Sequence, residues 1–230
     1  MFLLGGPAFS GKTLLAHLLN QSHVTCLDEP DFHDAGQRDR GLPVLHALFP
    51  DVVFPQVPDA SLTHEEAMDL LEGCERAMAP RILGMKTSDW TFITYALLYK
   101  RRRYPVIALM RDIRDVLAEG PLPEWIDEPG LNERYRLIWQ HRHLFDLLVR
   151  YEDLVTKPRK VLKRCSALLS QPLEMKETWR RESVPPHMIK LPRHELLTSG
   201  AIVGTQVGLW RVGPREFTSD TLATVAMTQY

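Results

Sequence analysis

A glycine-rich loop near the amino end of the chain joins a short apolar run to a leucine-rich run. The loop reads GPAFSGKT (residues 6–13), the apolar run covers residues 2–5 and the leucine-rich run covers residues 14–19. Glycine allows backbone conformations with positive φ, so the N–H groups of such a loop can line a concave anion site at the start of a helix. This order of strand, loop and helix is the context that a phosphate-binding P-loop requires. The sequence therefore predicts an α/β fold whose first loop holds a phosphate or sulfate group.

Five residues of this loop are the predicted anion-binding residues: Gly6, Ser10, Gly11, Lys12 and Thr13. The lysine supplies a mobile cation for the outermost oxygens, and the threonine hydroxyl can bind an oxyanion or a magnesium ion. We also predict a catalytic role for Lys12, because a cation beside the transferred group stabilises the charge that develops there. The alternative is an ordinary glycine-containing turn with a solvated lysine.

Apolar and polar segments alternate along the rest of the chain with the spacing of strands and helices. Residues 31–58 predict an irregular insertion that holds the acceptor, and the Pro- and Gly-rich residues 182–217 predict a loop that covers the site. The alternation predicts a doubly wound parallel sheet with helices on both faces, in a single domain over residues 1–230. The predicted strands are residues 2–5, 24–27, 82–85, 106–110 and 147–151, and the main predicted helices are residues 12–21, 63–76, 89–99, 132–148 and 157–169.

Composition limits the classes of partner and compartment. The formal net charge of the 230 residues is -1, which gives no global basic field for a nucleic-acid partner. The three cysteines show no CxxC or metal-ligand spacing, so we expect reduced thiols, a cytoplasmic location and no metal site. No apolar run approaches the ~20 residues of a membrane span, and the P-loop lies close to the first residue, so we expect neither a membrane span nor a signal peptide. The basic residues 100–103 predict a solvated helix end, with contact to a phosphate or acceptor as the alternative.

Three further segments resemble, in the same order, the sulfotransferases that use 3′-phosphoadenosine-5′-phosphosulfate (PAPS). They are LMRDIRDV (residues 109–116), RYEDLVTKP (residues 150–158) and GLWR (residues 208–211). The resemblance implies that Arg111 binds the 3′-phosphate of PAPS, and that the loop with Trp210 and Arg211 covers the nucleotide. It also implies that the RYEDL segment serves packing and internal polar pairing. From the residues alone, Arg111 could instead pair with Asp115, and Trp210 could belong to the core.

The same resemblance suggests which side chains carry the chemistry. Lys86 matches the lysine that the family places on the leaving group, although it could equally be a surface lysine. The segment VTCLDE (residues 24–29) resembles a Cys-Gly-Glu-Glu stretch of tyrosylprotein sulfotransferases, which implies that Glu29 is the general base, with Asp28 as its competitor. Many cytosolic members instead use a histidine at the position of Ser88, which cannot serve as an equivalent base. Sulfuryl transfer consists mostly of positioning and charge stabilisation, so it requires no metal.

Two departures from the family pattern keep other functions open. The family loop usually reads P-[KR]-[ST]-G-T-T, whereas here the cation stands at Lys12 and the family's cationic position is Phe9. Glu119 stands where the family has a serine eight residues after the arginine, and it would repel a phosphate there. The sequence therefore supports a PAPS-dependent sulfotransferase acting on a hydroxyl or amine of a small molecule or carbohydrate. The alternatives are an ATP- and magnesium-dependent small-molecule kinase and a catalytically idle nucleotide-binding protein. Neither the acceptor nor the oligomeric state follows from the sequence.

Overall fold

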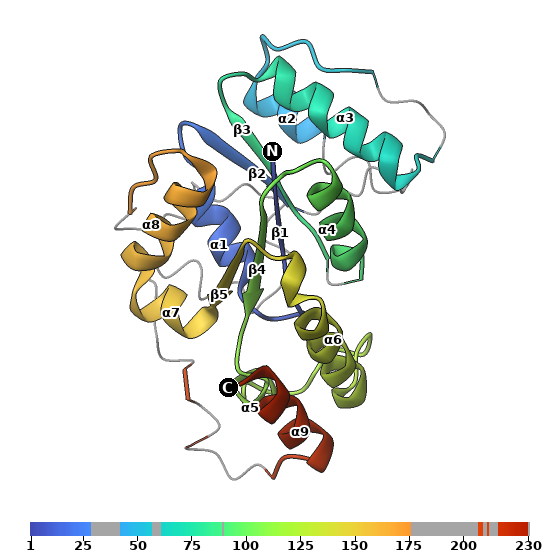
Figure 1. Cartoon of the computed structure of the whole chain (residues 1–230), viewed down its shortest axis with the longest axis vertical. Coiled ribbons are helices and arrows are strands. Elements are labelled where there is room, and N and C mark those ends of the chain that lie inside the picture. The colour runs from blue at the N-terminus through green and yellow to red at the C-terminus, as the bar shows by residue number, and fades with distance from the viewer. Residues whose placement is uncertain are drawn as a thin grey trace.

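The computed structural model describes residues 1–28, 42–56, 61–88, 90–175, 207, 208, 211 and 216–229. Five parallel strands form one sheet in the order β2-β3-β1-β4-β5 (Figure 1). The strands are β1 (Phe2–Gly5), β2 (Val24–Asp28), β3 (Ile82–Lys86), β4 (Val106–Met110) and β5 (Leu147–Arg150). The helices are α1 (Lys12–Leu19), α2 (Leu42–Leu48), α3 (His64–Ala77), α4 (Phe92–Arg101), α5 (Ile113–Ala118), α6 (Glu128–Gln140), α7 (Tyr151–Thr156), α8 (Pro158–Leu169) and α9 (Ser219–Thr228).

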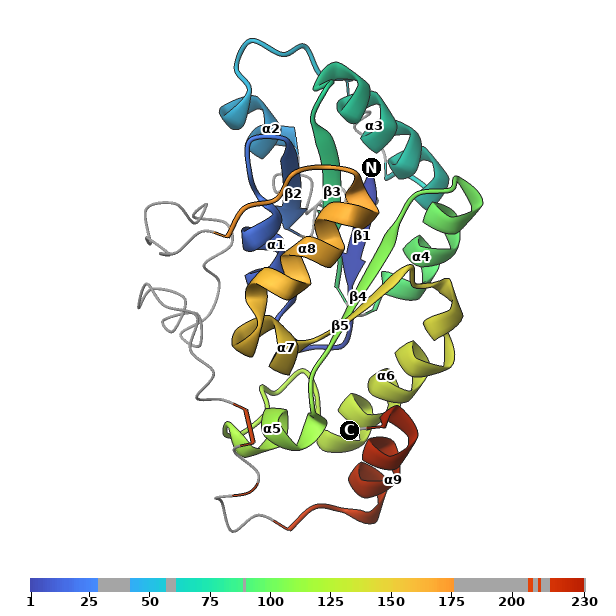
Figure 2. The same cartoon turned by 60° about the vertical axis from the view of Figure 1, so that its left-hand side comes forward.

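Helices cover both faces of the sheet. Figures 1 and 2 show α1, α7 and α8 on one face, and α4 and α6 on the other. Side chains alternate between the two resulting cores: Leu3 of β1 lies in the core with α4, and Phe2 and Leu4 lie in the core with α1. This arrangement confirms the predicted parallel α/β sheet. Among the described residues, no helix is long and apolar enough to cross a lipid bilayer.

The parallel register brings the P-loop, Lys86 and the end of β4 to one edge of the sheet. Central strand β1 pairs with β3 and β4, so that Leu4 lies beside Lys86 on one side and Ile107 on the other. In β2, Asp28 is the register partner of Lys86. Because all strands run in the same direction, the P-loop and the carboxyl ends of β2, β3 and β4 meet at this edge, where α/β folds bind ligands.

The predicted long helix over residues 132–148 is wrong at both ends. Helix α6 covers Glu128–Gln140, and a 3-10 turn at Arg142–Leu144 separates it from β5. The Asp127 carboxylate accepts a hydrogen bond from the backbone N–H of Gly130 at 2.9 Å, which caps the helix before a proline in its first turn. This capping pattern sets the earlier start.

The predicted irregular insertion at residues 31–58 contains a helix. Helix α2 covers Leu42–Leu48, with Leu42 and Leu45 buried in the core. Pro43 lies in its first turn, where a helix has no use for the missing N–H group. Residues 29–41 and 57–60 lie outside the described residues, as does most of the predicted covering loop at residues 182–217.

The basic residues at the end of α4 hold α3 in place. The Arg102 guanidinium donates to carboxylates of α3 at distances of 2.7 to 2.9 Å, which are those of Glu65, Asp69 and Glu72. Lys100 pairs with Asp146 at 2.7 Å. Residues 100–102 end the helix as expected, but their cations form ion pairs and are not simply solvated.

The carboxyl-terminal helix α9 packs on α6 through a polar contact that the sequence did not suggest. The Asn132 side-chain N–H donates to the Thr221 hydroxyl at 3.0 Å, and that hydroxyl donates to the Glu128 carboxylate at 2.6 Å. Arg136 also pairs with Asp220. These bonds fix the end of the chain on the helix that follows α5.

Candidate functional site

The P-loop adopts a conformation that requires its two glycines. Gly6 has φ 140° and Gly11 has φ 90°, both in the region that side chains disfavour. A Cβ on Gly6 would lie 2.0 Å from the Leu109 carbonyl oxygen, and one on Gly11 would lie 2.5 Å from the Tyr151 ring. The loop therefore packs against β4 and α7 with no space for side chains at these positions.

The polar side chains of the P-loop point toward its own backbone or into the protein. The Lys12 ammonium donates to the carbonyl oxygens of Gly6 at 2.8 Å and Pro7 at 2.7 Å. Among the described residues, the fully buried Ser10 hydroxyl has no hydrogen-bond partner. A buried polar group without a partner costs free energy, which an oxyanion in the loop would recover. The loop thus combines a cation, an unsatisfied hydroxyl and the start of α1.

Lys86 joins the end of β3 to the end of β2 and to the P-loop. Its ammonium pairs with the Asp28 carboxylate and donates to the Thr13 hydroxyl at 3.3 Å. The exposed fraction is 4% for Lys86 and 2% for Asp28, so this is a buried ion pair and the surface alternative for Lys86 is wrong. The structure therefore brings Thr13, Lys86 and Asp28 together as one contact at the carboxyl edge.

Of the two candidate bases, Asp28 and Glu29, only Asp28 is among the described residues. Asp28 is held against Lys86 in the interior, and Glu29 lies outside the described residues. Cys26 is buried in the same strand, where desolvation and the nearby Asp28 charge raise the pKa of its thiol. Cys26 is therefore a neutral thiol at neutral pH and is no nucleophile for this site.

Arg111 lies at the end of β4 and pairs with Glu119, not with Asp115. Its guanidinium is 2.8 Å from the Glu119 carboxylate, and it lies 4.5 Å from the centre of the Tyr151 ring. Burial lowers the pKa of Arg111, but the hydrogen bond and the charge of Glu119 outweigh burial and raise it above its ordinary value. A phosphate that binds Arg111 would therefore compete with a carboxylate that already neutralises it.

The described part of the predicted covering loop contacts helix α5. The backbone N–H of Gly208 donates to the Asp115 carboxylate of α5 at 2.8 Å. Arg211 is exposed, its backbone N–H donates to the Gly208 carbonyl oxygen at 3.0 Å, and Trp210 lies outside the described residues. Asp115 thus anchors the loop segment, and the described carboxylate partner of Arg111 is Glu119.

The RYEDL segment has the internal polar contacts that its resemblance implied. The Glu152 carboxylate accepts a hydrogen bond from the Asp112 backbone N–H at 2.9 Å. Burial raises the pKa of Glu152, although the hydrogen bonds from backbone N–H groups act against this effect.

Ser88 stands at the position of the family histidine. Its hydroxyl lies 3.2 Å from the Thr91 hydroxyl at the start of α4.

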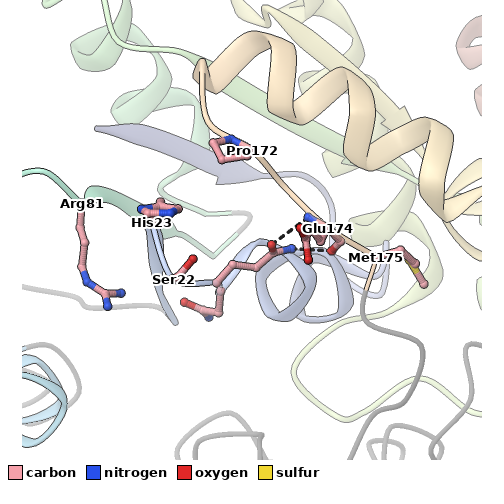
Figure 3. Close-up of a pocket in the computed structure, with 8 residues that line it drawn as sticks. Ser22, His23, Arg81, Pro172, Glu174 and Met175 are labelled. Atoms are coloured by element: carbon pink, nitrogen blue, oxygen red, sulfur yellow. Dashed lines mark hydrogen bonds between the residues drawn. The ribbon is translucent and has the colours of Figure 1, made fainter.

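A hollow of about 590 Å³ lies at the opposite edge of the sheet (Figure 3). It is next to the beginning of β2. In its lining, the Gln21 side chain donates to the Glu174 carbonyl oxygen at 2.8 Å and accepts from the Glu174 backbone N–H at 2.9 Å. Its lining residues are Asn20, Gln21, Ser22, His23, Arg81, Pro172, Glu174 and Met175. Because the P-loop is at the carboxyl edge, this hollow takes no part in the candidate site.

The buried Lys86–Asp28 pair makes a stability prediction that is independent of function. Lys86→Met leaves Asp28 as an unpaired buried charge and is expected to lower the free energy of unfolding by about 3–5 kcal/mol in urea denaturation. The double variant Asp28→Asn/Lys86→Met should recover part of this loss. The exposed pair of Lys157 and Asp153, with a nitrogen–oxygen distance of 3.6 Å, provides the control, since Lys157→Met should change stability by less than about 1 kcal/mol. Equal effects of the two single variants would contradict the buried pair.

The comparison with solved structures identifies the fold. A sulfotransferase domain from the curacin biosynthetic pathway superposes with a TM-score of 0.72 at 18% identity, covering 100% of this chain and 97% of that one. A sulfotransferase domain from the Synechococcus PCC 7002 olefin synthase superposes with a TM-score of 0.64 at 18% identity, covering 100% of this chain and 94% of that one. No family model matches the sequence, and no curated protein matches it. The chain has the fold of these sulfotransferase domains over its whole length.

Proposed function

We propose that this protein is a sulfotransferase that moves the sulfuryl group of PAPS to a hydroxyl or amine of a small-molecule or carbohydrate acceptor. The observation that carries the proposal is the contact of Lys86 with Thr13, which places a buried second cation against the P-loop. The fold shared with sulfotransferase domains supports the same reaction. In this proposal the P-loop holds the 5′-phosphosulfate with Gly6, Ser10, Gly11, Lys12 and Thr13.

The proposed reaction is a single displacement at sulfur. The acceptor oxygen or nitrogen forms a bond to sulfur while the bond from sulfur to the 5′-phosphate oxygen breaks. The electron pair of the broken bond stays on adenosine 3′,5′-bisphosphate, and the acceptor proton goes to a general base. Lys12 and Lys86 stabilise the negative charge that grows on the leaving oxygen, which is the main contribution of the protein.

Glu29 remains the proposed general base, with Asp28 as the alternative. Asp28 is 2% exposed and lies against Lys86, so an acceptor hydroxyl has little access to its oxygens. Its position suits it to orient the lysine. Glu29 follows it directly in the sequence, at the carboxyl end of β2.

Arg111 remains the proposed partner of the 3′-phosphate, together with Trp210 and Arg211 in the covering loop. Binding requires the guanidinium to exchange the Glu119 carboxylate for a phosphate oxygen. Arg111 sits at the carboxyl end of β4, next to the P-loop strand, which is a suitable place for one end of a nucleotide. Glu119 is therefore expected to weaken the preference for a 3′-phosphate.

The residues at the end of β4 argue against the kinase alternative. A P-loop kinase needs a carboxylate there to hold magnesium, but this strand ends at Met110 and the residue that follows is Arg111. The next residue, Asp112, caps α5 by accepting from the Arg114 backbone N–H at 2.9 Å, and it also pairs with the Arg114 side chain. The Gly-Lys-Thr loop still makes ATP the correct competing ligand in a binding test.

Nucleotide selection tests the proposed donor. Adenosine 3′,5′-bisphosphate should raise the melting temperature more than ADP or ATP with magnesium, because it is the nucleotide product of the proposed reaction. A ligand at 100 times its Kd adds about 2.7 kcal/mol to the free energy of unfolding, which thermal-shift measurement detects. A response confined to ATP with magnesium would favour the kinase, and no response to any nucleotide would favour an idle protein.

Paired variants at the end of β4 test the proposed 3′-phosphate contact. Arg111→Ala should weaken adenosine 3′,5′-bisphosphate about 10- to 150-fold, as expected for a lost charged hydrogen bond, and should spare adenosine 5′-phosphosulfate. Glu119→Gln should strengthen only the bisphosphate, because it removes the competing charge and keeps the side-chain shape. Calorimetric titration gives both affinities. Equal changes for the two nucleotides would rule out this role for Arg111.

The proposed base is tested by turnover. Glu29→Gln should reduce the rate of sulfate transfer by about 10²–10⁴, the span of general-base effects, with nucleotide affinity nearly unchanged. Glu133→Gln, an exposed position on α6, is the matched control and should keep full activity. Turnover that survives Glu29→Gln would move the base to Asp28 or to the substrate.

A further inference from the structure

Four side chains from separate parts of the chain form an aromatic–arginine cluster: Phe9, Trp90, Trp125 and Arg134. The guanidinium carbon of Arg134 lies 3.6 Å from the ring centre of Trp90 and 5.7 Å from that of Trp125. Phe9 stacks on Trp125 with 5.8 Å between ring centres and an angle of 26° between the rings. Since Phe9 belongs to the P-loop and Trp90 follows β3, the cluster connects the two segments that carry Lys12 and Lys86.

The tryptophans of the cluster are exposed, and the arginine that contacts them is buried. The exposed fraction is 72% for Trp90, 54% for Trp125 and 9% for Arg134. Burying an aromatic ring away from water is favourable, so exposed rings beside the P-loop indicate a surface that a ligand covers. Phe9 also has φ 61°, a conformation uncommon for a residue with a side chain and frequent at ligand sites.

Arg134 gives this surface a preference for charge. The Arg134 guanidinium lies over the Trp90 ring, and cation–π attraction holds this planar group there. Within that plane its N–H groups form a fork that matches the two oxygens of a carboxylate. A flat apolar surface and a planar cation therefore lie side by side, next to the P-loop.

We propose that the aromatic–arginine cluster is the acceptor subsite, and that it takes an acceptor whose aromatic ring carries both the hydroxyl to be sulfated and a carboxylate. The ring stacks on Trp125 and Phe9, and the carboxylate pairs with Arg134. The hydroxyl then lies toward the P-loop, where Lys12 and Lys86 act on the donor. This inference names the acceptor class of the proposed sulfotransferase and rests on that function.

The test compares two probes that differ only in charge, 4-hydroxyphenylacetate and 4-hydroxyphenylacetamide. Calorimetric titration of the wild-type protein should give at least about 10-fold tighter binding of the carboxylate, the expected gain from a charged hydrogen bond. Arg134→Met should reduce this preference to about 2-fold or less, and Arg134→Lys should keep part of it. Trp125→Leu should weaken both probes by a similar factor of about 2–12.

Arg142 provides a matched control, because its guanidinium also lies over a tryptophan, 5.1 Å from the ring centre of Trp139. Arg142→Met should leave both affinities unchanged. Wild-type protein that binds neither probe at up to about 10 mM would overturn the inference. It would equally be overturned by a carboxylate preference that is absent, or that survives Arg134→Met in folded protein, or by probe displacement with adenosine 3′,5′-bisphosphate.

Nucleotide binding separates this inference from the proposed function. Adenosine 3′,5′-bisphosphate should bind wild-type and Arg134→Met protein equally. If the nucleotide binds but the probes show no dependence on Arg134, the acceptor subsite is wrong and sulfuryl transfer stands. If the probes depend on Arg134 but no nucleotide binds, the cluster is a binding site and the sulfotransferase proposal fails.

Discussion

The buried ion pair of Lys86 and Asp28 organises the carboxyl edge of the sheet. Each charge alone would be costly in the interior, so each holds the other in place at the ends of β3 and β2. The contact of the same ammonium with Thr13 extends this constraint to the P-loop. In the proposed reaction, a lysine held in this way needs little reorganisation when negative charge develops on the donor.

Arg111 and Glu119 repeat this arrangement on the other side of β1. Lys86 and Arg111 are each matched by a carboxylate, and a phosphate that binds Arg111 as proposed must replace the Glu119 carboxylate. Such an exchange costs less than creating unpaired buried charges, because a partner is present before and after binding. The strength of the pair between Arg111 and Glu119 can then determine which nucleotide binds more tightly.

Local rules predicted the parts of this structure that depend on a few neighbouring residues. The P-loop was predictable because its backbone requires glycine at two positions. The strands and the parallel sheet were predictable because apolar and polar segments alternate along the sequence. The predicted ends of α6 were wrong because they ignored Asp127 as the N-cap. Helix α2 was not predicted because its proline suggested a turn. The sequence suggested Lys86 and Arg111 only through family resemblance. Their partners Asp28 and Glu119 became visible when strand register and helix α5 placed them. The aromatic–arginine cluster joins residues that are distant in sequence, so no local sequence pattern could have predicted it.

The most direct test of the account is a crystal structure of the protein with adenosine 3′,5′-bisphosphate. The account predicts the 5′-phosphate inside the P-loop, within hydrogen-bond distance of the Lys12 and Lys86 ammonium groups. It also predicts that the Arg111 guanidinium has turned from Glu119 to the 3′-phosphate. A nucleotide bound away from the P-loop, or an Arg111 still paired with Glu119 beside a bound nucleotide, would contradict it.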